Sequence, residues 1–169
     1  MFEQLPDGAP VQIRPIRSTD KELLSEGLRR LSDDSVHRRF LSPKRSFSGS
    51  ELRYLTEVNA VDHVALIALD PTKPERELLA VGRFVRLAED PEAAEIAIVV
   101  GDDWQGRGLG SLLGGHLVHA ARNRGIKRFT ATMAADNRPA HRLMARLTSR
   151  LEQRHAGGGV DELVLDLVA

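Results

Sequence analysis

Residues 95–111 read Glu95-Ile-Ala-Ile-Val-Val-Gly-Asp-Asp-Trp-Gln-Gly-Arg-Gly-Leu-Gly-Ser111, and this stretch decides the fold. The apolar run at its start predicts a β-strand, and the amphipathic segment after it predicts a helix. The glycine-rich turn between them leaves backbone N–H groups uncovered at a helix N-terminus, where the helix dipole favours negative charge. The stretch therefore predicts a strand–loop–helix unit that binds a phosphate-bearing ligand, a glycine turn without a ligand being the alternative.

Three known kinds of phosphate-binding loop can be compared with this turn. No lysine follows the glycines, as a nucleoside-triphosphate loop requires. A dinucleotide-binding pattern that starts at Gly106 would place its third glycine at Ser111, and no acidic residue occurs about 20 positions further on. The third pattern, Gln/Arg-x-x-Gly-x-Gly/Ala, is met by Gln105, Gly108 and Gly110.

Between a strand and a helix, this third pattern resembles the pyrophosphate loop of the GNAT superfamily of acyl-CoA-dependent N-acyltransferases. The segment 94–108 is also similar to bacterial Pat-type protein-lysine acetyltransferases, as is the early segment Leu31-Ser-Asp-Asp-Ser-Val-His-Arg-Arg-Phe40. The resemblance covers nearly the whole chain, because the order of the predicted elements agrees as well. It leaves a nucleotide-binding protein as a third possibility, which competition between CoA and ATP or NAD would test.

Hydrophobic periodicity and turn residues divide the chain into alternating short elements. We expect residues 1–169 to form a single α/β (α+β) domain with a mixed, mostly antiparallel central sheet. The resemblance implies helices on both faces and a parallel strand pair that splays apart. The predicted strands span residues 11–17, 63–69, 78–87, 95–100, 127–134, 150–155 and 161–168, and the predicted helices span residues 18–31, 36–40, 50–58, 109–124 and 139–147.

Composition excludes several classes of function. The 24 basic and 24 acidic residues cancel and only 4% of the chain is aromatic, so we expect no nucleic-acid partner. No run of about 18 apolar residues occurs and the first residues do not resemble a signal peptide, so we expect a cytoplasmic protein without a membrane partner. The chain has no cysteine, which excludes a thiol nucleophile. His116 and His119 have no carboxylate at ligand spacing, so no metal site is predicted.

The resemblance implies acetyl-CoA as co-substrate. The pantetheine arm would lie between the splayed strands against the backbone around Ile98 and Val100, and the amides of residues 106–111 would hold the pyrophosphate. Arg107 would add a charge-assisted contact, and Asn137 matches an asparagine that often reaches the ligand in this family, although it is also a good helix N-cap. The predicted cofactor-binding residues are Ile98, Val99, Val100, Gln105, Gly106, Arg107, Gly108, Leu109, Gly110, Ser111 and Asn137.

Amine acetylation needs a base. A lysine-type amine has a pKa of about 10.4 and is protonated at neutral pH, and in this form it has no lone pair with which to attack a thioester. Glu95 is the candidate, since it shares a strand face with the small residues Ala97 and Val99 and the apolar run is expected to desolvate its carboxylate. In Pat-type enzymes a glutamate at this place is the usual base, acting through water. The alternative is a solvated carboxylate that pairs with an arginine.

Two departures from the family pattern concern the end of the reaction and the acceptor. Met144 occupies the position where many members carry a tyrosine that protonates the leaving thiolate, and methionine has no proton to donate. Thr148-Ser149 replaces the usual Gly-Phe after the last helix. The sequence therefore predicts an acetyl-CoA-dependent N-acetyltransferase acting on a primary amine of a protein lysine or a small molecule, or instead an acyl-CoA-binding sensor or interaction module. The resemblance is compatible with a homodimer.

Overall fold

The computed structural model describes residues 1–168, which fold around one eight-stranded sheet in the order β1-β2-β3-β4-β5-β6-β8-β7. The strands are β1 (Phe2–Gln4), β2 (Pro10–Pro15), β3 (His63–Asp70), β4 (Glu77–Arg86), β5 (Ala93–Val100), β6 (Arg128–Ala134), β7 (Leu151–Gly157) and β8 (Val160–Asp166). The helices are α1 (Lys21–Arg30), α2 (Asp33–Phe40), α3 (Gly49–Thr56), α4 (Leu109–Arg122) and α5 (Arg138–Leu147), with the short 3₁₀ segments η1 (Ser18–Asp20) and η2 (Asp102–Trp104).

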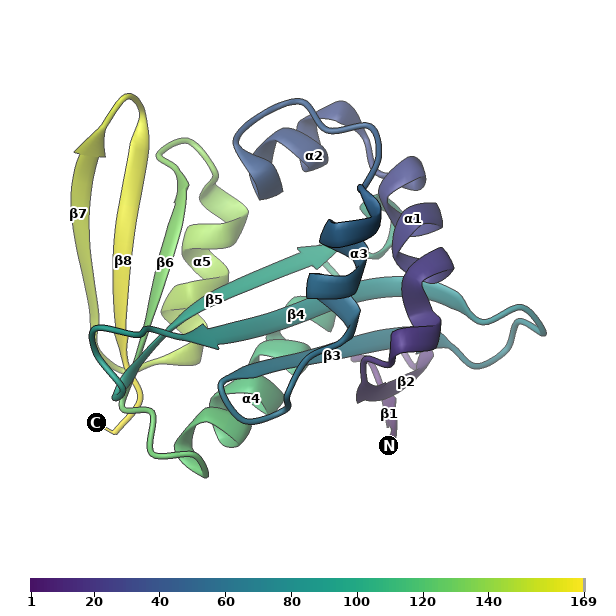
Figure 1. The fold of residues 1–169 in the computed structure, drawn as a ribbon, viewed down its shortest axis with the longest axis horizontal. Helices are drawn as coiled ribbons and strands as arrows, with labels where there is room; N and C mark the ends of the chain where they lie inside the picture. Colours follow the sequence, from purple (N-terminus) through teal and green to yellow (C-terminus); the bar gives the residue numbers. More distant parts are fainter. Residues whose placement is uncertain (169) are drawn as a thin grey trace.

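The centre of the sheet splits where β5 and β6 meet. These two strands run parallel and pair only between 93–95 and 128–130, whereas the other neighbouring strands in the described chain are antiparallel. Beyond this short pairing, β4 holds β5 as far as Val100 and β8 holds β6 as far as Ala134. The two strands therefore diverge with different partners, and α2 lies across the open end of the divergence (Figure 1).

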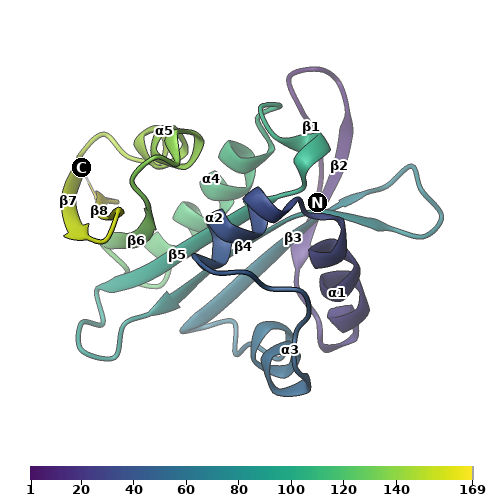
Figure 2. The same cartoon turned by 90° about the horizontal axis from the view of Figure 1, so that it is seen from above.

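Helices cover both faces of the sheet. Seen from above, α1 and α3 lie on one face of the central strands, and α4 and α5 lie on the other (Figure 2). The α4 side contains the larger part of the core, in which Phe84 and Phe129 contact with ring centroids 5.5 Å apart. Gly82 lets α4 approach β4, because an added Cβ there would lie 2.8 Å from the Leu117 side chain.

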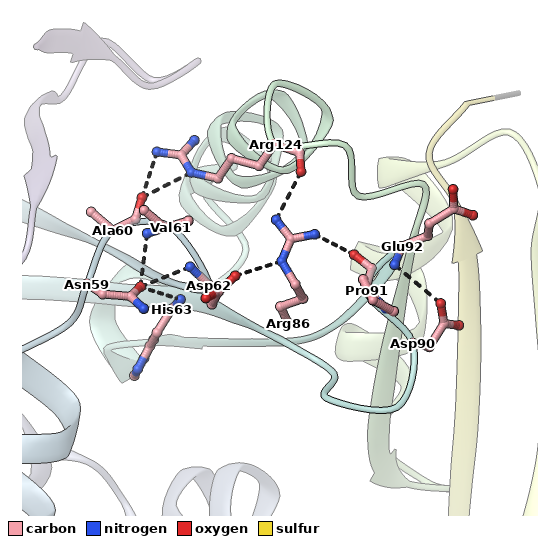
Figure 3. A network of polar contacts seen from close by, with 10 residues as sticks. All are labelled: Asn59, Ala60, Val61, Asp62, His63, Arg86, Asp90, Pro91, Glu92 and Arg124. Atoms are coloured by element: carbon pink, nitrogen blue, oxygen red, sulfur yellow. Dashed lines mark hydrogen bonds and ion pairs between the residues drawn. The ribbon is translucent and has the colours of Figure 1, made fainter.

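A dense set of polar contacts closes the other end of the β5–β6 pair; we call it the closed-end clamp (Asn59, Ala60, Asp62, Arg86, Pro91 and Arg124; Figure 3). The Arg86 guanidinium donates to Asp62 Oδ1 at 2.8 Å, to the Arg124 carbonyl at 2.9 Å and to the Pro91 carbonyl. Arg124 in turn donates twice to the Ala60 carbonyl, at 3.0 and 2.9 Å. The clamp ties the end of α4 to the start of β3 and to the β4–β5 turn.

The observed architecture confirms the predicted fold class, including the splayed parallel pair and helices on both faces. One strand was not predicted: β1, which has three residues and is held by its antiparallel pairing with β2. Helix α4 ends at Arg122, two residues before the predicted end, and Gly125 then adopts a left-handed conformation with φ 74°. None of the described helices combines the length and apolar character that crossing a membrane requires.

Candidate active site

The divergence of β5 and β6 opens a cleft of about 690 Å³. Its walls are formed by β5 and β6, the loop after β5, the C-terminal half of α2 and one side of α5. This volume lies within the usual range of about 300–1,000 Å³ for small-molecule sites. Most of the residues predicted from the sequence line this cleft together: Glu95, Ile98, Val99, Val100, Gln105, Gly106, Gly108, Gly110, Ser111 and Asn137.

The glycine loop presents its backbone donors without partners. Gly106 and Gly108 have positive φ angles of 72° and 90°, a conformation that glycine adopts without steric cost. Within the described chain, none of the six successive N–H groups from Gly106 to Ser111 donates to an acceptor. Successive N–H groups without acceptors at the start of a helix, here one of 14 residues, are typical of an anion-binding turn.

The edge of β5 that faces the cleft is also largely free. From Ile96 to Val100 the strand pairs with β4 on one side and with no strand on the other. An extended ligand could therefore pair with this backbone edge, as a strand would. The Val100 carbonyl is the exception, since it accepts a hydrogen bond of 3.0 Å from Gln105 Nε2.

Gln105 joins the loop to α2. Besides the Val100 carbonyl, its amide donates to Ser35 Oγ at 3.1 Å, and nearby Asp102 Oδ1 accepts from the Ser32 amide at 3.3 Å. Ser32 also caps α2 by accepting from the Ser35 amide. The Gln105 side chain thus fixes the loop relative to α2, a contact across 70 residues that spacing within the motif does not reveal.

Arg107 and Leu109 do not line the cleft with their side chains. The Arg107 guanidinium lies 4.1 Å from the Trp104 ring and donates from Nε to Asp7 at 2.7 Å, so it faces the β1–β2 turn. The Leu109 side chain is fully buried in the core beneath the loop. The backbone N–H groups of these two residues have no acceptor in the described part of the chain.

Glu95 lies in the cleft wall, where β5 and β6 part. Its side chain is exposed, so the expected desolvation of the carboxylate is wrong: the apolar neighbours in sequence face the core, while Glu95 faces the opening. Arg39, at the end of α2, is close enough for the Glu95 charge to oppose the lowering of the Arg39 pKa by burial. The sequence analysis missed Arg39 because 56 positions separate it from Glu95 in the chain.

Asn137 and Met144 occupy the α5 side of the cleft. Asn137 caps α5, with Oδ1 accepting from the Ala140 amide at 3.3 Å, which confirms the predicted N-cap. Its Nδ2 donates to no acceptor in the described chain, so this amide is available to a ligand. Met144 lines the cleft and is only 3% exposed. The position of the missing tyrosine therefore holds a side chain without a transferable proton.

Comparison with known proteins assigns this geometry to a family. The model of the acetyltransferase (GNAT) family matches residues 34–148. The acetyltransferase Pat of Mycolicibacterium smegmatis is 36% identical over 148 residues, which are 85% of this chain and 42% of that protein. An acetyltransferase of Pseudomonas aeruginosa is 32% identical over 136 residues, covering 80% of this chain and 73% of that protein.

Solved structures agree with this assignment. The GNAT domain of the S. lividans PAT superposes with a TM-score of 0.87 and 30% identity, covering 98% of this chain and 96% of that one. A Salmonella typhimurium protein solved with its cofactor acetyl-CoA shares the fold, with a TM-score of 0.70 and 17% identity over 93% of this chain and 94% of that one. The chain belongs to the GNAT acetyltransferase family. It spans less than half the length of the M. smegmatis Pat enzyme.

Proposed function

We propose that this chain transfers an acetyl group from acetyl-CoA directly to a primary amine, with Glu95 as the general base. One observation carries the proposal: six unpartnered loop amides and an exposed carboxylate line the same cleft, between two strands that have parted. The first feature suits the phosphates of a CoA ester, and the second suits proton removal from an amine. Residues 1–169 are proposed to act as one domain.

The chain offers contacts for two parts of acetyl-CoA, the pyrophosphate and the pantetheine arm. The amides of residues 106–111 would hold the pyrophosphate, with Gln105 keeping the loop in place. The free edge of β5 from Ile98 to Val100 would bind the pantetheine arm by strand-like hydrogen bonds, and Asn137 Nδ2 would donate to its end. Arg107 and Leu109 would contribute their backbone amides to the pyrophosphate contacts, and their side chains would not contact the ligand.

The chemistry then follows from the positions of a few side chains. When bound, acetyl-CoA supplies the thioester carbonyl. Glu95 takes one proton of the ammonium group through a water molecule, and the neutral amine attacks the thioester carbonyl. A C–N bond forms, the C–S bond breaks, and the nitrogen releases its second proton to solvent, which leaves a neutral amide. Because Met144 has no proton to give, the thiolate leaves unassisted or takes a proton from water. Positioning of the two substrates supplies the remainder of the rate enhancement.

Met144 also favours the second candidate function, an acyl-CoA-binding sensor or interaction module with little chemistry. The two functions share the loop and the β5 edge and differ in whether Glu95 matters. Substituting Glu95→Gln keeps the shape of the side chain and removes the base, so turnover separates them.

The first experiment is titration calorimetry of the purified chain with acetyl-CoA, using ATP and NAD as controls. Micromolar binding of acetyl-CoA without binding of the two nucleotides supports the proposal. Absence of acetyl-CoA binding overturns it and leaves the loop as a structural turn. A screen of primary amines with a colorimetric thiol reagent then detects transfer, because each acetyl group moved releases one molecule of free CoA thiol.

A further inference from the structure

A second, smaller pocket of about 70 Å³ opens from the cleft. It lies between the sheet and the three helices α1, α2 and α3, and its wall is mostly apolar, with contributions from Leu24, Leu28, Phe47, Leu55, Leu78 and Val81. Arg39, Phe40, Ala97 and Val99 line both this pocket and the cleft. The pocket shares no residue of the loop from Gly106 to Ser111, so it lies apart from the proposed phosphate contacts.

Strand register places the second arginine of this pocket, Arg83, on the same sheet face as Glu95. Arg83 on β4 lies opposite Ala97 on β5, and opposite residues of paired strands point their side chains to one face. Glu95 is two positions from Ala97 and shares that face. The Cβ atoms of Arg83 and Glu95 are thus diagonal neighbours, typically about 7–8 Å apart.

One nitrogen of the Arg83 guanidinium group is held by hydrogen bonds, and the other two have no partner within the described residues. Its Nη1 donates to the Leu55 carbonyl at 3.1 Å and to His63 Nε2 at 2.9 Å. Burial and the Arg83 charge lower the pKa of His63 to about 4, so the imidazole is a neutral acceptor at neutral pH. The Nε and Nη2 groups of Arg83 have no acceptor in the described chain, although the residue is only 7% exposed.

Arg39 has still fewer partners. Its guanidinium lies 5.0 Å from the Phe40 ring and donates to no acceptor among residues 1–168. Burial lowers the pKa of both arginines, to about 10 for Arg83, where the Arg39 charge adds to the effect. Both remain cationic at neutral pH. Neither arginine is in an ion pair with a described residue, although the Glu95 charge acts on Arg39 at longer range. A ligand anion would stabilise these two adjacent cations, which lie in a pocket with mostly apolar walls.

We propose that Arg39 and Arg83 bind a carboxylate of the acceptor, which is therefore a small primary amine that carries a carboxylate on an apolar carbon skeleton, as α-amino acids do. The inference rests on the proposed function, because it places the acceptor amine beside Glu95 and the acceptor carboxylate on the arginines of the same sheet face. A structural role for Arg83 needs only Nη1, which holds the end of α3. Arg39 makes no hydrogen bond within the described residues, so hydrogen bonding to the fold does not explain its position in the pocket.

The test compares two acceptors with the same side chain, leucine and leucinamide. They differ in the carboxylate, which also raises the pKa of the amine, so each kcat/KM is calculated on the concentration of neutral amine at the assay pH. Initial rates of CoA thiol release give kcat/KM for each with wild type, Arg39→Met and Arg83→Lys. Arg53→Met is the control, since Arg53 is exposed on α3 and its side chain makes no hydrogen bond or ion pair among the described residues. An effect of the Arg39 substitution on Glu95 changes kcat/KM for both acceptors by the same factor. The ratio of the two kcat/KM values therefore reports only the carboxylate. Arg39→Met removes no hydrogen bond of the fold, so it tests the idea even if Arg83→Lys unfolds.

We expect wild type and Arg53→Met to prefer leucine over leucinamide by about ten- to hundredfold, the effect of a charge-assisted hydrogen bond. Arg39→Met should lose at least tenfold of that preference. Equal kcat/KM values for both acceptors with the wild type overturn the inference about the carboxylate. The thiol release observed in that case still supports the proposed acetyl transfer. If acetyl-CoA binds but neither acceptor reacts, calorimetric titration of leucine into the CoA-bound chain decides, and no binding overturns the inference. Failure to bind acetyl-CoA overturns the proposed function instead.

A peptide arm distinguishes the source of the carboxylate. A lysine peptide with a neighbouring aspartate is compared with its asparagine counterpart. One outcome would change the acceptor but not the role of the arginines: the wild type acetylates only the aspartate peptide, Arg39→Met abolishes this acetylation, and leucine is not preferred over leucinamide. The arginines would then bind a carboxylate next to a lysine of a protein, and not the carboxylate of a small molecule.

Discussion

The two ends of the β5–β6 pair use the same chemical groups in opposite ways. At the closed end, the guanidinium groups of Arg86 and Arg124 donate to carbonyl and carboxylate oxygens of the fold (Figure 3). At the open end, six loop amides and most of the donors of Arg39 and Arg83 have no partner in the described chain. Donors that are all used within the fold, as at the closed end, indicate a structural role. Donors without a partner that face a cleft, as at the open end, suit a ligand.

The largest expected effect is at the open end, on chemistry rather than stability. Glu95→Gln should lower kcat/KM by about 10²–10⁴-fold, the usual contribution of a general base. The Kd for acetyl-CoA should stay unchanged, because the glutamine keeps the shape of the cleft wall. Thiol-release kinetics and calorimetry on the same preparation measure both quantities. Unchanged turnover would show that the Glu95 carboxylate has no role in catalysis and would favour the sensor function.

The second prediction concerns His63, whose backbone amide bonds to Asn59 of the closed-end clamp and whose ring contacts Arg83 at the open end. Its folded-state pKa of about 4 lies below the ordinary value of 6.5, so the unfolded chain takes up the proton first as pH falls. Stability that is present above pH 6.5 is therefore lost as pH falls toward 4, by about 2–3 kcal/mol.

Urea unfolding at several pH values between 7.5 and 4.5 measures this loss. Carboxylates such as Asp20, whose burial is outweighed by Arg14 and backbone donors so that its pKa is lowered, add to the loss in the same direction below about pH 5. A variant without the His63 imidazole therefore supplies the baseline. In His63→Gln, which still accepts from Arg83 but does not titrate, the slope between pH 6.5 and 4.5 should flatten. An unchanged slope in that variant would assign the pH dependence to other groups.

At the closed end, Arg86→Met should cost stability and spare the cofactor site. The substitution leaves the Arg124 and Pro91 carbonyls without their donor and breaks the ion pair with Asp62. The free energy of unfolding should fall by about 1–3 kcal/mol, with an unchanged Kd for acetyl-CoA. Arg76→Met is the matched control, because Arg76 is exposed and its side chain makes no hydrogen bond or ion pair in the described chain. A large loss of acetyl-CoA affinity in Arg86→Met would refute the division between the two ends.

The smallest effect is expected for single methyl groups on the loop and on α4. Gly108→Ala forces a positive φ on alanine and brings its Cβ within 3.2 Å of Pro6, so stability should fall by about 1 kcal/mol and acetyl-CoA binding should weaken severalfold. Gly115→Ala, with φ in the helical range and open space around it, should stabilise the chain by about 0.5–1 kcal/mol. Equal stability changes in the two variants would show that the loop conformation is not specified by Gly108.

Local patterns predicted most of the elements and part of the site. The Asn137 N-cap, the apolar β5 run and the glycine loop all appear where the sequence placed them, because capping, periodicity and positive-φ turns depend on neighbouring residues. Gly114 is tolerated inside α4 for a tertiary reason: an added Cβ would lie 2.8 Å from the Leu147 side chain.

The sequence by itself therefore determined the family, the strand–loop–helix unit and the residues that can present free amides, since these depend on short-range geometry. Only the tertiary structure decided that Arg107 turns to Asp7, that Glu95 faces solvent at the divergence of β5 and β6, and that Arg39 and Arg83 share one pocket. The physical reason is that these features depend on which residues of distant segments meet, and side-chain pairing across 44 to 100 positions leaves no periodic trace in the chain.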